Sequence, residues 1–227
     1  MPKNTPKDLK TKALVLRRTN YSEADRILNL ITPEGKVSVI AKGVRKPKSK
    51  LAGSVEMFTL FEANLHFGRS EMGVLTGASM VRFYGGILKD LDRMSLATFV
   101  LKEISKVSEN LEAPEFFEIA NECLAALDEG MANEVVEAWF LLNLAKAMGE
   151  QVNLLTDTDG EDLAADECYD WDANERTFFK NPNGKYDANA IKAVRIMWGM
   201  NLEAVRRIKD FGGYAARVLE IAKACYN

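Results

Sequence analysis

The sequence predicts an α+β protein in which a small five-stranded barrel precedes an all-α helical domain. Residues 11–83 form short apolar runs separated by turn residues, which is typical of strands. After Gly85 and Gly86, apolar residues recur at helical spacing. The charge changes at the same place, because residues 1–86 carry 15 Lys and Arg against 7 Asp and Glu, whereas residues 87–227 carry 15 against 26. We therefore expect two domains, residues 1–83 and 84–227.

Five runs in the first part are expected to be strands. The first begins at residues 13–16, and the other four cover residues 26–31, 36–41, 61–67 and 72–81. In the fourth run, Phe61, Ala63, Leu65 and Phe67 alternate with polar neighbours, so one face of this strand is expected to be buried. Five short strands in one segment favour a barrel, because closing a sheet removes its exposed edges.

The second part is expected to form helices around a central apolar one. Helical spacing covers residues 96–110 and 114–127, and residues 134–148 are apolar on nearly all sides, which is typical of the centre of a bundle. A final helix is expected from about residue 211 onward. Residues 151–187 form an acidic insertion, in which two short apolar segments predict a small hairpin.

Composition disfavours membrane and disulfide-rich classes. No run approaches the roughly 18–20 apolar residues that cross a bilayer, and the first residues contain no apolar stretch typical of a signal peptide. The three cysteines (Cys123, Cys168 and Cys225) are odd in number and far apart, so a disulfide framework is not expected. The expected location is the cytoplasm, without membrane contact.

Residues suited to catalysis or metal binding are scarce. The single histidine, His66, lies on the presumed polar face of a strand and is expected to be a surface residue. Neither common glycine-rich phosphate motif occurs. Asp157, Asp159 and Glu161 either hold a divalent cation or form a solvated acidic loop, and their spacing lacks the calcium-loop pattern. Cys168 has no neighbouring cysteine for a zinc ribbon. We predict no catalytic residue, no cofactor and no metal.

The strongest chemical signal is the basic loop, defined as residues 42–50. Lysine runs are often solvated turns, but a five-stranded barrel binds single strands with one face and its loops. Arg17, Arg18, Arg26 and Arg69 add charge nearby in the sequence. Five phosphate contacts predict a log–log salt slope of roughly −3 to −4, at about −0.7 per contact. The five predicted contacts are Lys42, Arg45, Lys46, Lys48 and Lys50. Most phenylalanines of this part fit the core better than a stacking surface, so binding is predicted to be mainly electrostatic.

These segments resemble the bacterial recombination-mediator family RecO. The similarity lies in residues 21–28 (YSEADRIL) and residues 41–53 (AKGVRKPKSKLAG), followed by Leu60-Phe61-Glu62 and Arg69-Ser70. Over residues 11–83 the similarity lies in specific motifs, and over the rest of the chain it lies only in the expected domain architecture. The resemblance implies an oligonucleotide/oligosaccharide-binding (OB) barrel, a helical domain and no catalytic site. Glu23 and Asp25 are expected to fix the first turn or to pair with arginine.

The resemblance also implies a role and partners. Members bind single- and double-stranded DNA, anneal complementary strands, and act with RecR to help RecA replace single-strand-binding protein. They dock the acidic tail of that protein on the helical domain, where the candidates in this chain are Lys192, Arg195, Arg206, Arg207 and Lys209. Many members hold zinc through four cysteines in the region matching residues 151–187; only Cys168 remains here, so no zinc is expected. The implied location is the cytoplasm, on the nucleoid during repair.

Two other functions stay open. A barrel with a basic loop also suits an RNA-binding accessory protein, and the loop would equally suit a protein–protein adaptor with an acidic partner. A metal-dependent nuclease fits the residues least.

Overall fold

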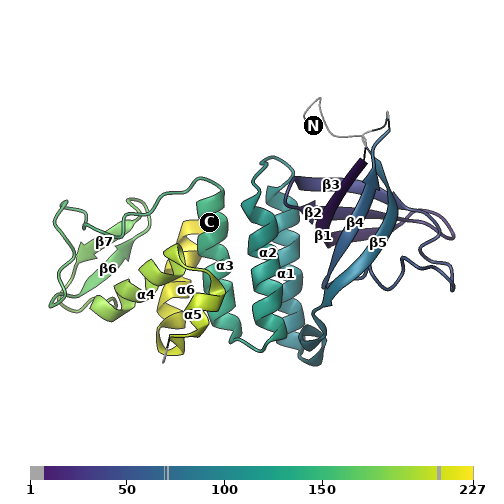
Figure 1. Ribbon diagram of the computed structural model, residues 1–227. Helices are drawn as coiled ribbons and strands as arrows, with labels where there is room; N and C mark the ends of the chain where they lie inside the picture. Colours follow the sequence, from purple (N-terminus) through teal and green to yellow (C-terminus); the bar gives the residue numbers. More distant parts are fainter. Residues whose placement is uncertain (1–7, 69, 71, 209–210, 227) are drawn as a thin grey trace. The chain divides into compact units, whose positions relative to one another are not determined.

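The computed structural model describes residues 8–68, 70, 72–208 and 211–226 (Figure 1). The chain divides into two compact units, Met1–Asp128 and Glu129–Asn227. The predicted domain boundary after residue 83 coincides with the end of the last barrel strand. Two helices that follow this strand group with the barrel in the first unit. No helix of the described residues is long and apolar enough to span a membrane.

The first unit begins with a closed five-stranded barrel, which confirms the predicted fold class. Its strands are β1 (Asp8–Asn20), β2 (Arg26–Thr32), β3 (Gly35–Ala41), β4 (Thr59–His66) and β5 (Gly73–Phe83). The strand order is β1-β2-β3-β5-β4, and β1 closes the barrel by pairing with β4 through its first half and with β2 through its second half. A five-stranded barrel of this kind is an OB-fold.

Inward-facing side chains fill the barrel, as the alternation on β4 predicts. Phe61, Ala63 and Leu65 are each at most 1% exposed. The core also includes Val44 and Val55, which belong to the connection between β3 and β4. Because both valines are buried in the barrel, the connection is attached to the core at Val44, inside the basic loop, and again at Val55 beyond it, so the loop cannot swing freely as a whole.

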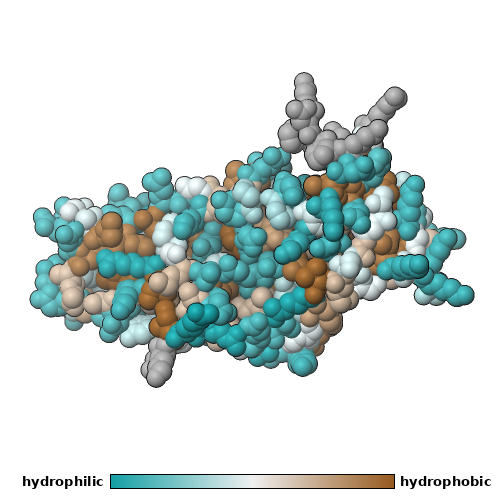
Figure 2. All heavy atoms as spheres, in the orientation of Figure 1, coloured by the Kyte–Doolittle hydropathy of each residue, from teal (hydrophilic) through white to brown (hydrophobic). Residues whose placement is uncertain are grey.

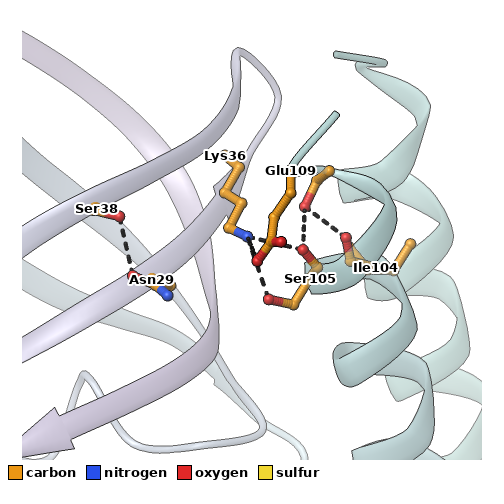
Figure 3. Close-up of polar contacts among 7 residues, drawn as sticks. Asn29, Lys36, Ser38, Ile104, Ser105 and Glu109 are labelled. Carbon is orange, nitrogen blue, oxygen red and sulfur yellow. Dashed lines mark hydrogen bonds and ion pairs between the residues drawn. The ribbon is translucent and has the colours of Figure 1, made fainter. Parts of the chain in front are cut away.

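Helical elements complete the first unit, and polar contacts hold them to the barrel. They are η1 (Gly85–Lys89), α1 (Leu91–Val107) and α2 (Glu115–Asp128). Lys36 Nζ of β3 donates to the Ser105 carbonyl oxygen at 2.8 Å and lies 3.4 Å from a Glu109 carboxylate oxygen (Figure 3). Arg82 Nη2 of β5 contacts Asp128 Oδ2 at 2.8 Å. These contacts join both helices to strands of the barrel.

Gly86 allows a close approach of two segments that a side chain would prevent. Its backbone N–H donates to Asp128 Oδ1 at 2.7 Å. A Cβ atom at this position would lie 2.2 Å from the Asp128 carbonyl oxygen, a distance that no real Cβ contact shows. The glycine therefore permits close packing of η1 on the end of α2, inside one compact unit.

The second unit is a helical bundle with a small hairpin. Its elements are α3 (Asn133–Ala147), β6 (Tyr169–Asp172), β7 (Thr177–Lys180), α4 (Ala188–Gly199), α5 (Leu202–Arg206) and α6 (Gly212–Tyr226). The prediction of a central apolar helix is confirmed, since α3 packs against both α4 and α6. Trp139 of α3 donates through Nε1 to the Met200 carbonyl oxygen at 2.7 Å, which satisfies the polar atom of a buried ring.

The acidic insertion is organised by hydrogen bonds and aromatic packing. Asp157 is only 7% exposed, and its Oδ1 accepts from the backbone N–H groups of Asp159 and Glu161, both at 3.0 Å. The Asp157 carboxylate is therefore not solvated, as the acidic-loop alternative expected, but buried, and it closes a turn of the insertion. In the hairpin, the Phe178 and Trp171 rings meet edge to face at 5.1 Å. Over the described residues, no three His, Cys, Asp or Glu side chains gather as a metal site.

Candidate nucleic-acid interface

The start of the basic loop is anchored to the turn between β1 and β2. The Gly43 N–H donates to Asp25 Oδ1 at 2.7 Å, and the Arg45 N–H donates to the Ala24 carbonyl oxygen at 2.9 Å. Arg45 Nη1 also donates to the Ser22 carbonyl oxygen at 2.6 Å. Gly43 has a φ of 66°, a left-handed conformation that glycine adopts without strain. The β1–β2 turn and the start of the basic loop are thus joined, and the Asp25 carboxylate holds the loop and not the turn itself.

Glu56 attaches the far end of the same connection to the β1–β2 hairpin. Its carboxylate pairs with Arg18 and, at 3.2 Å, with Arg26 Nη1. Burial, followed by the positive charges of Arg18 and Arg45, lowers the pKa of Arg26 from its usual value. One carboxylate thus pairs with two guanidinium groups, so the local charge stays positive.

The loop lysines remain available to a ligand. Lys42, Lys46, Lys48 and Lys50 are all exposed. Within the described part of the chain, no carboxylate forms an ion pair with any of them. Exposed lysines with no internal counter-ion are suited to phosphate oxygens, because binding does not first require breaking an ion pair.

Arg17 and Arg18 do not belong to the same face of the barrel. In the β1–β2 register, Arg18 lies opposite the core residue Leu28, whereas Arg17 lies opposite Asn29. Successive side chains of a strand point to opposite faces, so Arg17 is directed away from the side that Arg18 shares with Arg26. Arg69, the remaining predicted DNA contact, lies outside the described residues. We name the grouped set the cationic surface: Arg18, Arg26, Lys42, Arg45, Lys46, Lys48 and Lys50.

Two of the predicted partner-binding residues in the second unit already have ionic partners. Arg206 pairs with Glu129, and Arg207 Nη2 lies 2.9 Å from Glu203 Oε1, one helical turn earlier. A ligand carboxylate would have to compete with these internal ones. Their positive charge is therefore less available than that of the loop lysines.

The other predicted partner-binding residues differ from one another. Arg195 Nε donates to the Leu154 carbonyl oxygen at 2.8 Å, which ties α4 to the start of the insertion. Lys192 is exposed on α4, and no ion pair holds it among the described residues. Lys209 lies outside the described residues. Among the described residues, the predicted partner-binding residues thus do not form one group of unpaired charges.

Most phenylalanines of the barrel lie in the core, as predicted: Phe58, Phe61 and Phe67 are buried. Phe83 differs, because it is 46% exposed at the end of β5, and Tyr21 is 64% exposed. A sequence pattern cannot reveal this, since the barrel and the helices after it decide how much of a strand end is covered.

The fold and the cationic surface together define a class of protein. A closed five-stranded barrel with exposed lysines on one of its loops has the architecture of the oligonucleotide/oligosaccharide-binding (OB) fold. Family comparison is more specific. The model described as "Recombination protein O N terminal" matches residues 7–84, and "Recombination protein O C terminal" matches residues 88–211. The chain belongs to the recombination protein O family.

Curated relatives carry the name DNA repair protein RecO. The protein of Dehalococcoides mccartyi (strain CBDB1) is 34% identical over 151 residues, which are 66% of this chain and 59% of the relative. That of Roseiflexus sp. (strain RS-1) is 32% identical over 146 residues, or 64% and 51%. That of Listeria monocytogenes serotype 4a (strain HCC23) is 28% identical over 142 residues, or 62% and 55%. The chain thus spans between half and three fifths of the length of these relatives.

Proposed function

We propose that this chain is a non-enzymatic DNA-repair mediator that binds single- and double-stranded DNA and anneals complementary strands. The observation that carries the proposal is the cationic surface. Its loop lysines are exposed and without a carboxylate partner among the described residues, and its arginines lie beside them at the β1–β2 hairpin. Membership of a family whose relatives are named DNA repair proteins supports DNA as the ligand.

Phosphate contacts suit annealing better than contacts with bases would. Two complementary strands repel each other through their backbones, and bound lysines reduce this repulsion by replacing condensed counter-ions. Because phosphate contacts carry no sequence information, base edges can stay free to find their complements. A surface of exposed lysines therefore accelerates pairing without selecting a sequence and without a catalytic group.

The proposed partners follow the family. We assign to the chain cooperation with RecR, assistance to RecA in displacing single-strand-binding protein, and a place in the cytoplasm on the nucleoid during repair. A cavity of about 320 Å³ in the second unit supports docking of the acidic tail of single-strand-binding protein. Val135, Val205 and Phe211 give it apolar walls, and Arg206 contributes a cation. The tail carboxylate would replace Glu129 as the partner of Arg206.

An annealing assay at several salt concentrations tests the proposal. We expect the chain to accelerate pairing of complementary oligonucleotides, with an effect that weakens as salt rises. In the variant Lys46→Glu/Lys48→Glu/Lys50→Glu, three contacts are lost, so the log–log salt slope of single-strand binding falls in magnitude by about 2. The matched control is Lys89→Glu/Lys102→Glu/Lys106→Glu, which makes the same charge change at exposed lysines of η1 and α1. Equal losses in the two variants would contradict a specific cationic surface.

The same assay separates the alternatives. An RNA-binding accessory protein would bind RNA oligonucleotides more tightly than DNA and would not accelerate DNA annealing. An adaptor for an acidic protein would bind neither nucleic acid with measurable salt dependence. Strand cleavage in the presence of magnesium or manganese would point to a nuclease and against the proposed role.

A further inference from the structure

An apolar groove opens in the first unit beside the cationic surface. It encloses about 720 Å³ between the connection before β4, the end of β5 and the start of α1. Leu88, Leu91, Met80 and Phe83, which line it, are 53%, 78%, 49% and 46% exposed. Brown and tan atoms reach the surface beside α1 near the lower part of β5 (Figure 2). Single exposed apolar side chains are common, but a contiguous set is typical of a binding site.

The groove is continuous with the cationic surface. Arg18 and Glu56 line the groove, and Glu56 also pairs with Arg26. Arg26 in turn lies opposite Ala41, the residue directly before the basic loop, in the β2–β3 register. A chain whose anionic backbone lies on the lysines therefore has the groove directly beside it.

We propose that the groove receives unstacked bases of a single DNA strand, with Phe83 as the stacking surface. This inference rests on the proposed function. A single strand combines a regular anionic backbone with flat apolar faces, which matches a cationic surface next to an apolar groove. The volume lies within the range of small-molecule pockets and suits a few bases.

The groove adds a selectivity that phosphate contacts lack. In a duplex, the base faces are stacked on one another and cannot reach Phe83, whereas in a single strand they can. Stacking on an aromatic ring is tolerant of sequence, because every base has a π-face. The groove thus favours single strands over duplexes while the loop lysines bind both.

Substitution of Phe83 in the full-length chain tests the inference. We expect Phe83→Ala to weaken binding of an oligothymidylate by about 5- to 100-fold, with the salt slope and the affinity for a duplex of the same length unchanged. Phe83→Trp should retain single-strand affinity, because it keeps a stacking ring. The control is Phe179→Ala, which removes a 37% exposed ring of β7. Thermal unfolding of each variant reports whether the fold is intact.

The results distinguish this inference from the proposed function. If the wild-type chain binds DNA with a steep salt slope but Phe83→Ala weakens neither ligand, or both equally, the groove is not a base site and the mediator role stands. If an acidic, apolar peptide binds the groove and Phe83→Ala abolishes only that binding, the groove is a peptide site and the inference is overturned. If the wild-type chain binds no DNA, both proposals fail.

Discussion

Cations of the basic loop and cations of the helical unit differ in whether the protein has already neutralised them. In the helical unit, Arg206 pairs with Glu129, and Lys223 lies 3.3 Å from Glu137. Lys46 and Lys48 of the loop are exposed and pair with no carboxylate among the described residues. The comparison teaches that the number of basic residues in a sequence overstates the positive charge available to a ligand. Ion pairs within the protein neutralise some of these residues.

The difference has a local cause. The connection from residue 42 to residue 55 contains no acidic residue, so its lysines have no near neighbour in sequence with which to pair. Helices, by contrast, place residues four apart on one face, as with Glu203 and Arg207. An acid-rich helical unit therefore pairs several of its own cations, whereas a loop without acidic residues leaves its lysines exposed.

The largest expected effect comes from reversing matched sets of charges in the two regions. Lys46→Glu/Lys48→Glu/Lys50→Glu should lower single-strand affinity about 100-fold near tenth-molar salt, since each lost contact removes about 0.7 log units. Lys192→Glu/Arg206→Glu/Arg207→Glu should change it less than about 3-fold, since two of these cations are already paired. Fluorescence anisotropy measures both. Equal losses of affinity in the two variants would show that the loop cations are no more available to DNA than those of the helical unit.

Removing the anchor of the loop is the next largest change. Asp25→Ala leaves the Gly43 N–H without its acceptor, so we expect the free energy of unfolding to fall by about 1–3 kcal/mol. Glu23→Ala, an exposed acid in the same turn, should change it by less than about 0.5 kcal/mol. Urea denaturation distinguishes them. A similar loss in both variants would show that acidic charge, and not the Asp25 contact, holds the loop.

A smaller effect of opposite sign is expected where the cationic surface does carry an internal counter-charge, at Glu56. Glu56→Gln removes the ion-pair partner of Arg18 and Arg26, so single-strand affinity should rise about 5-fold per arginine released near tenth-molar salt. Glu62→Gln makes the same charge change in a barrel pair with Lys10 and serves as control. An equal gain in the control would mean that overall charge, and not release of the two arginines, controls affinity.

The smallest effect concerns the helical ion pair itself. Arg207→Gln should lower the free energy of unfolding by about 0.3–0.5 kcal/mol, as is usual for an exposed pair one helical turn apart. The loss should vanish in about 1 M salt, where such pairs are screened. Lys192→Gln, which breaks no ion pair, should cost nothing measurable in the same urea titration. A loss that persists in high salt would indicate packing by the arginine stem.

The barrel and the central helix were predictable because their patterns depend on local periodicity. Alternation at Phe61, Ala63 and Leu65 marks a strand whose inner face is buried, and the structure buries all three. The extent of β1 was not predictable. It runs from Asp8 to Asn20 through several charged residues, because β4 pairs with its first half and β2 with its second.

The candidate site was predictable in composition but not in arrangement. The basic loop is evident from its residues, and the structure groups it with Arg18 and Arg26. That Arg17 falls on the other face depends on the strand register, and the internal counter-charge at Glu56 depends on a loop–hairpin contact. Neither register nor long-range pairing is encoded in a short sequence window.

By itself, the sequence determined the order of strands and helices, the split between a basic and an acidic part, and the loop that carries the most positive charge. These depend on the periodicity and composition of neighbouring residues. Only the tertiary structure decided which cations stay unpaired, that Asp157 is buried, and that Phe83 lines a groove. These outcomes depend on segments distant in the chain, since burial and ion pairing are set by what packs against a residue and not by the residues beside it.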